Sequence, residues 1–169
     1  MGQIYLYYGS GGGKTTNALG LALRSVGHGR KVVIVQFMKG RKDIGEYKIA
    51  KRLGPEYEIH QFGTEDWVDL KNPSANDRRK AQEGLAFAKK ALADAPNLLV
   101  LDEIGLAAHC GLIDTRDVLD LLRNIPEKTD VVITGRWVPK ELIDRADFVN
   151  EVTDVKHPEK IPTVEGIQY

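Results

Sequence analysis

The sequence predicts an α/β fold built on a doubly wound, mostly parallel sheet of five or six strands. Three observations predict this fold class. Short apolar, β-branched runs alternate with segments of helical periodicity along the 169 residues. A glycine-rich segment follows the first apolar run, and two adjacent carboxylates follow the fourth. Polar residues at the carboxyl ends of buried strands are typical of ligand sites in open parallel sheets.

The first predicted strand covers residues 4–8, where every side chain is apolar or aromatic. This composition suits a strand that is buried on both faces, as in a parallel sheet under helices. Residues 31–37 and 98–101 are further short strands of mainly apolar and, at 31–37, β-branched residues. The remaining strands are predicted at residues 57–62, 130–134 and 148–152.

The predicted helices alternate with these strands, at residues 15–26, 46–52, 75–94, 114–124 and 139–146. Gly27 and Gly29 end the first helix, and Ser74 is placed to cap the third. Residues 63–76 form the least regular stretch and contain Trp67. A loop of this length inside a compact domain is usually functional or mobile.

Composition argues against several classes of protein. The 24 Lys and Arg residues balance 24 Asp and Glu residues, and no basic block stands out, so nothing indicates a nucleic-acid partner. No apolar run approaches the roughly 20 residues that span a bilayer, and the first strand begins too early to leave room for a signal peptide. Cys110, the one cysteine, fits a reducing compartment. We therefore expect a cytoplasmic protein whose residues 1–169 form a single domain.

Residues 9–16 read Gly-Ser-Gly-Gly-Gly-Lys-Thr-Thr and lie between a predicted strand and a predicted helix. This arrangement predicts a phosphate-binding loop, because consecutive backbone N–H groups wrap an anion only where side chains are absent. The dipole of the following helix favours the same negative charge. The predicted nucleotide contacts in the loop are Gly9, Ser10, Gly11, Gly12, Gly13, Lys14, Thr15 and Thr16. The alternative is a glycine-rich turn that binds nothing.

Within this loop, Lys14 is expected to neutralise the terminal phosphates, and Thr15 to place its hydroxyl on Mg²⁺ or Mn²⁺. The fold is then of the P-loop NTPase type, similar to RecA-like domains. Tyr8 stands where the first glycine of G-x-x-x-x-G-K-[ST] would fall, so the loop is one residue shorter than usual. A contracted loop still holds phosphate, but it need not expose the γ-phosphate of ATP for transfer.

Asp102 and Glu103 follow the apolar run at residues 98–101, as in the Walker B pattern. There a buried strand delivers acids to the ligand edge of the sheet, where one of them holds Mg²⁺ directly or through water. Asp102 is the better candidate for the metal, and Glu103 for a supporting or substrate contact. The alternative is a strand that ends in acids without binding a metal.

Three cations are candidates for supporting phosphate contacts. Lys39 and Arg136 follow predicted strands at their carboxyl ends, and a guanidinium such as Arg136 suits bidentate contact with phosphate. Arg24 lies on the helix that follows the phosphate loop. Each has a structural alternative, which is an ordinary surface side chain for Arg24 and Lys39 and a salt bridge for Arg136.

The full set of motifs is more specific than a phosphate loop, and it resembles the P-loop-type ATP:cob(I)alamin (corrinoid) adenosyltransferases. The similar segments occur in the family's order and cover nearly the whole chain. They are residues 9–16, 20–24, 27–29, 35–40, 101–103, 132–136, 155–157 and 166–169.

The resemblance implies an enzyme that binds ATP in an orientation reversed relative to kinases, so that the ribose C5′ carbon faces the corrinoid. Co(I) attacks C5′ and triphosphate leaves. Lys14, Arg136 and Mg²⁺ would then stabilise the leaving triphosphate, Thr15 with Asp102 or Glu103 would hold the metal, and Arg24 and Lys39 would support the phosphates. A reductase partner for Co(II) and a homodimer are also implied.

The family also places aromatic side chains over the corrin. Trp67 is the implied counterpart and, with Lys14 and Arg136, completes the expected catalytic set; Phe62 is a weaker second aromatic. The segment reads Gly-Thr-Glu-Asp-Trp, whereas the family's usual pattern is Gly-Phe-Thr-Trp. A core tryptophan is the alternative for Trp67.

Further departures from the family's pattern leave other functions open. Gly12 stands where the family commonly has lysine, and Trp137 begins Trp-Val-Pro in place of Gly-Cys-His. With three residues before the first strand, an N-terminal arm over the corrin is not expected. The alternatives are an NTPase or kinase that acts at the γ-phosphate, and a nucleotide- or corrinoid-binding paralogue without turnover.

Overall fold

The computed structural model describes residues 2–169 and contains one sheet of six strands, all parallel. The strand order across the sheet is β3-β2-β4-β5-β1-β6. This confirms the predicted fold class. The strands are β1 (Ile4–Tyr8), β2 (Val32–Phe37), β3 (Tyr57–Phe62), β4 (Leu98–Asp102), β5 (Asp130–Gly135) and β6 (Phe148–Glu151).

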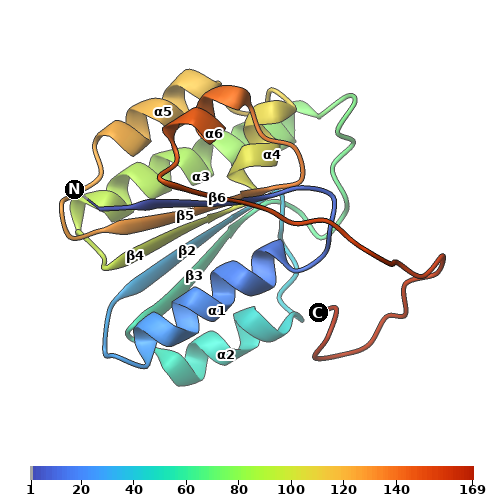
Figure 1. Cartoon of the computed structure of the whole chain (residues 1–169), viewed down its shortest axis with the longest axis horizontal. Helices are drawn as coiled ribbons and strands as arrows, with labels where there is room; N and C mark the ends of the chain where they lie inside the picture. The colour runs from blue at the N-terminus through green and yellow to red at the C-terminus, as the bar shows by residue number, and fades with distance from the viewer. Residues whose placement is uncertain (1) are drawn as a thin grey trace.

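Helices cover both faces of the sheet (Figure 1). One face carries α1 (Lys14–Val26) and α2 (Gly45–Leu53). The other face carries α3 (Ala75–Ala93), α4 (Ile104–His109), α5 (Thr115–Arg123) and α6 (Lys140–Arg145). No helix in residues 2–169 is both long enough and apolar enough to cross a membrane.

Strand β2 shows why the central strands are mainly apolar on both of their faces. Val33, Val35 and Phe37 belong to the core cluster on the α3 side of the sheet, whereas Val32 and Ile34 belong to the cluster on the α1 side. Successive side chains of a strand point to opposite faces, so a strand covered on both faces needs apolar residues throughout.

The parallel register brings the carboxyl ends of four strands to one edge of the sheet. Tyr8 of β1 lies beside Gly135 of β5, and Gln36 of β2 lies beside Asp102 of β4. The helix that follows β1 covers one face, while the helices that follow β4 and β5 cover the other (Figure 1). After these strands the chain therefore turns toward opposite faces of the sheet. In open parallel sheets, ligands bind at the point where neighbouring strands diverge in this way.

The predicted elements agree with the structure to within two residues at their ends, apart from one helix. Ser74 caps α3 as predicted, and its hydroxyl accepts a hydrogen bond from the backbone N–H of Asp77 at 3.1 Å. Helix α4, whose first five residues are all buried, was not predicted from the sequence. A short helix that is apolar on every side has no polar face to produce helical periodicity, which explains the omission.

Gly135 at the end of β5 is expected to be essential for the close packing of α4. A Cβ atom at this position would lie 2.7 Å from the backbone nitrogen of Leu106 and 3.0 Å from backbone atoms of Gly105. Gly135→Ala should therefore lower the free energy of unfolding by about 1–3 kcal/mol, as measured by urea denaturation.

Gly20 provides the matched control for this substitution. It lies in the middle of α1, where a Cβ atom would meet nothing within 4 Å in the described structure. Gly20→Ala should raise stability by up to about 1 kcal/mol. Equal stability of Gly135→Ala and the unmodified protein would contradict the tight contact between α4 and β5.

Candidate active site

The loop between β1 and α1 offers an open anion site. Gly9 and Gly13 have φ angles of 115° and 97°, which L side chains rarely adopt. Gly13 precedes α1, and among residues 2–169 no side chain caps the first turn of this helix. Its first N–H groups and its dipole are therefore available to a phosphate.

The segment after β6 runs along the same loop. The backbone N–H of Gly11 donates to the carbonyl of Val152 at 2.9 Å, and the N–H of Gly12 donates to Asp154 Oδ1 at 3.1 Å. The phosphate loop is thus held in shape by one backbone and one side-chain contact to a segment more than a hundred residues away in the chain. A bound phosphate would compete with the Asp154 carboxylate for the Gly12 N–H.

Lys14 and Arg136 bring positive charge to the mouth of this loop. Lys14 Nζ donates to the carbonyl of Gly11 at 2.5 Å, so the side chain folds back over the loop. Burial lowers the pKa of Lys14, Glu103 opposes this change, and the nearby charge of Arg136 adds to it. An incoming anion would relieve the repulsion between Lys14 and Arg136.

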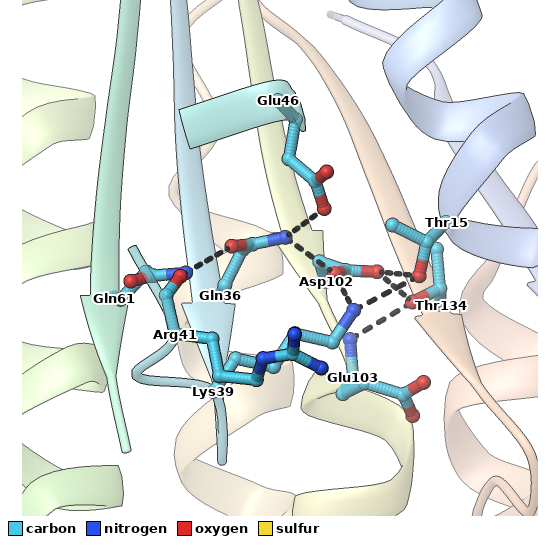
Figure 2. Close-up of polar contacts among 9 residues, drawn as sticks. All are labelled: Thr15, Gln36, Lys39, Arg41, Glu46, Gln61, Asp102, Glu103 and Thr134. Carbon is cyan, nitrogen blue, oxygen red and sulfur yellow. Dashed lines mark hydrogen bonds and ion pairs between the residues drawn. The ribbon is translucent and has the colours of Figure 1, made fainter. Parts of the chain in front are cut away.

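Asp102 at the end of β4 is fully buried and accepts four hydrogen bonds (Figure 2). Thr15 Oγ1 and Thr134 Oγ1 each donate to Oδ1 at 2.8 Å. Lys39 Nζ donates to Oδ2 at 2.7 Å, and Gln36 Nε2 donates to the same oxygen at 3.2 Å. Burial alone would raise the pKa of Asp102, but the Lys39 charge and these hydrogen bonds outweigh it and hold the pKa below its usual value.

Gln36 extends this network across β2 and β3. Its Nε2 also reaches Glu46 Oε1 at 3.3 Å, and its Oε1 accepts from Gln61 Nε2 at 3.0 Å. Gln61 Nε2 in turn donates to the carbonyl of Arg41 at 2.9 Å. The amide of Gln36 is therefore held in the orientation in which its nitrogen faces Asp102 (Figure 2).

Glu103 differs from Asp102 in the hydrogen bonding of its carboxylate. Its φ of 65° places it in the left-handed region just before α4, and its N–H donates to Thr134 Oγ1 at 2.8 Å. Its Oε2 is buried and finds no hydrogen-bond partner in the described part of the chain. Burial raises the pKa of Glu103, and the charge of Asp102 adds to this effect. Glu103, rather than Asp102, therefore has the free carboxylate oxygen.

The donor set suits a hard divalent cation only when a substrate completes it. No group of three His, Cys, Asp or Glu side chains that could hold a metal occurs among residues 2–169. The Thr15 hydroxyl and the Glu103 carboxylate supply oxygen donors of the kind that Mg²⁺ prefers. Magnesium usually takes one or two protein oxygens together with phosphate oxygens and water, so these residues fit a metal that arrives with a nucleotide.

A cavity of about 790 Å³ joins the phosphate loop to an apolar wall. Its lining combines the charged groups of the loop with aromatic and aliphatic side chains; among the latter are Phe37, Met38, Trp67, Leu70, Leu106 and Trp137. The charged groups of the loop and a broad apolar surface thus line one cavity, which is the arrangement that a site for a charged and a large apolar ligand requires.

Two tryptophans stand at this cavity. Trp67 is fully exposed and lines it, which excludes the core position that was the alternative for this residue. Trp137 is 48% exposed, and the Arg136 guanidinium lies 5.4 Å from the centre of its ring. The sequence analysis did not place Trp137 in the site, although its position directly after Arg136 was a usable signal. Phe62 instead packs on Phe87 and the core.

The structure brings Lys39 and Arg136 to the site but not Arg24. Arg24 lies in the last turn of α1, ten residues and about 15 Å from Lys14 along the helix. It lines a separate hollow with Tyr5 and Asp130 at the amino-terminal edge of the sheet. The phosphate contact expected of Arg24 is therefore not supported by the geometry of this chain, because the amino-terminal end of α1 adjoins the phosphate loop and Arg24 lies at the opposite end.

Glu103→Gln is expected to stabilise the ligand-free protein at neutral pH, because it removes a buried charge whose oxygen has no partner. The raised pKa of Glu103 means that its ionised form weakens the fold above that pKa, and that the penalty vanishes below the unfolded value of about 4.3. The expected gain in unfolding free energy at neutral pH is on the order of 1 kcal/mol.

Urea denaturation at neutral and at acid pH measures this difference. The gain should shrink as the pH falls, and the exposed Glu127→Gln should show no gain at either pH. A Glu103→Gln protein less stable than the unmodified one at neutral pH would mean that the carboxylate has a stabilising partner.

Known proteins of the same family resemble this chain over nearly its whole length. Residues 1–169 match the family described as ATP:corrinoid adenosyltransferase BtuR/CobO/CobP. The corrinoid adenosyltransferase of Escherichia coli strain K12 is 36% identical over 157 residues, which are 92% of this chain and 79% of that protein. That of Pseudomonas aeruginosa is 34% identical over 171 residues, which are 99% of this chain and 84% of that protein. A third, from Sinorhizobium sp, is 34% identical over 173 residues, 99% of this chain and 80% of that protein. These matches confirm the resemblance read from the motifs, and the chain belongs to the ATP:corrinoid adenosyltransferase family.

Proposed function

We propose that this chain, as a single domain, transfers the 5′-deoxyadenosyl group of ATP to the Co(I) ion of a corrinoid and releases triphosphate. One observation carries the proposal. The phosphate loop with Lys14, Glu103 and Arg136 lines the same cavity as Trp67 and Trp137. The anionic and the apolar substrate of such a reaction would therefore meet in one space.

The loop and its cations hold the triphosphate. The N–H groups at the start of α1 bind phosphate oxygens, and Lys14 and Arg136 neutralise the charge that develops as triphosphate leaves. The electron pair of Co(I) forms the bond to C5′, and the pair of the C5′–O bond departs with the triphosphate oxygen. No proton is transferred in this step, so the chain needs to supply position and charge rather than a base.

The metal is assigned to Thr15 and Glu103, with phosphate oxygens and water as its other ligands. When bound, Mg²⁺ or Mn²⁺ supplies positive charge to the leaving triphosphate. Asp102 accepts four hydrogen bonds and is paired with Lys39, so its part is to orient the Thr15 hydroxyl. This reverses the preference between the two acids that the sequence indicated.

Trp67 and Trp137 would contact the corrin. Their exposed rings offer flat apolar area at the cavity wall, and contact of an aromatic ring with the macrocycle would exclude water from the reacting cobalt. The apolar residues Met38, Leu70 and Leu106 form the rest of that surface.

We also expect a reductase partner, a homodimer and a cytoplasmic location. We expect a separate reductase to supply the electron that converts Co(II) to Co(I). The exposed edge strand β6, with Phe148 and Val149 at its surface, offers a face for a second copy in a homodimer. The free thiol of Cys110 suits the reducing cytoplasm.

Anaerobic incubation with Mg-ATP and chemically reduced cob(I)alamin tests the reaction. The Co(I) absorption bands should give way to those of a light-sensitive organocobalt product, with an equal amount of triphosphate released. Release of ADP and phosphate would instead indicate an NTPase. ATP binding without any product would indicate a binding protein.

Lys14→Ala should lower kcat/KM for ATP by at least about 100-fold, because the leaving group loses its nearest cation. The same spectroscopic assay measures the change. Lys31→Ala is the control, since Lys31 pairs with Glu58 on the surface outside the cavity. Unchanged turnover of Lys14→Ala would contradict the phosphate-loop assignment.

Trp67→Ala should weaken corrinoid binding by about tenfold while ATP affinity stays the same, because only the apolar wall is truncated. Equilibrium titration with each substrate separates the two effects. Leu23→Ala removes an exposed apolar side chain of α1 outside the cavity and should change neither affinity. A loss of ATP affinity in Trp67→Ala would place this residue on the nucleotide instead.

A further inference from the structure

Lys39 occupies a position next to the proposed metal ligands. Its ammonium lies 2.7 Å from Asp102 Oδ2 and 3.1 Å from Thr15 Oγ1 (Figure 2). The Thr15 hydroxyl gives its proton to Asp102 Oδ1 at 2.8 Å and therefore accepts from Lys39. The Lys39 ammonium thus already binds the oxygens of Thr15 and Asp102 to which a divalent cation could otherwise bind.

A metal ion bound to Thr15 would lie close to this ammonium. Magnesium takes oxygen ligands at about 2.1 Å, so an ion on Thr15 Oγ1 would stand at most about 5 Å from Lys39 Nζ. Two cations at this separation in a half-buried site repel each other strongly. Lys39 also neutralises Asp102, whereas Oε2 of Glu103 has no hydrogen-bond partner in the described part of the chain.

Lys39 has room to leave this position. Its side chain is 31% exposed although its partner Asp102 is almost completely buried. It lines the main cavity and also the neighbouring hollow that contains Arg41 and Glu46. An ammonium at the border of the cavity can turn toward a phosphate chain that brings its own negative charge.

We propose that Lys39 is a tethered cation that holds the oxygens of Thr15 and Asp102, beside the proposed metal position, until nucleotide binds. It keeps free divalent ions out of the ligand-free site, and it turns to the phosphates when the metal arrives as a nucleotide complex. The order of binding is thereby set, since metal and ATP enter together. This inference rests on the metal position given in the proposed function.

Titration with Mn²⁺, followed by the electron paramagnetic resonance signal of the free ion, tests the proposal without any turnover. In the absence of nucleotide, Lys39→Met should bind Mn²⁺ at least about tenfold more tightly than the unmodified protein, because one repelling charge is removed and Asp102 is freed. Adding Glu103→Gln to Lys39→Met should abolish most of the gain.

Two further variants serve as a substitute and as a control for Lys39→Met. Lys39→Gln retains a hydrogen-bond donor for buried Asp102, so it covers the case in which Lys39→Met does not fold, and the same increase in Mn²⁺ affinity is expected. Lys31→Met removes a lysine from a surface ion pair with Glu58 and should leave Mn²⁺ binding unchanged.

The outcomes separate this inference from the proposed function. If the unmodified protein fails to bind Mn²⁺ even with ATP, the metal position itself is wrong. If it binds Mn²⁺ with ATP, but the Lys39 variants bind free Mn²⁺ no better than it does, Lys39 only stabilises Asp102 and the inference is overturned. Equal Mn²⁺ affinity of the unmodified protein with and without ATP would also overturn it.

Discussion

The buried charge of Asp102 is the constraint on which the ligand edge of the sheet depends. A carboxylate without contact to water costs several kcal/mol unless it is paired and hydrogen-bonded. Its donors come from four different places: Thr15 from α1, Thr134 from β5, Gln36 from β2, and Lys39 from the loop after β2. Satisfying this one group therefore positions the phosphate loop, the central strands and the Lys39 loop relative to one another.

The two adjacent acids have different tasks because the backbone turns between them. Asp102 ends β4, and its side chain is buried. Glu103 has a left-handed backbone conformation, and its own side chain lines the cavity. Thr134 serves both residues, since its hydroxyl donates to Asp102 and accepts from the N–H of Glu103. One acid thus organises the site, and the other remains free for the metal that we assign to it.

The cavity combines two surfaces of opposite character. The glycine-rich loop, Lys14 and Arg136 form its polar, cationic side, and aromatic and aliphatic side chains form its apolar side. Trp137 lies where the two meet, because its ring lines the cavity and stands beside the Arg136 guanidinium. This arrangement agrees with membership of a family that brings ATP and a corrinoid together.

Local patterns were enough to predict the strands, most of the helices and the phosphate loop. Alternating apolar runs determine which segments are buried on both faces, and the Gly-rich segment followed by Lys14 and Thr15 predicts a loop between a strand and a helix, which the structure contains. Only the tertiary structure decided that α4 is a helix and that Trp67 is exposed at the cavity. It also decided that Lys39 pairs with Asp102, 63 residues further along the chain. Contacts of this kind depend on how distant elements pack, and no spacing along the sequence records that packing.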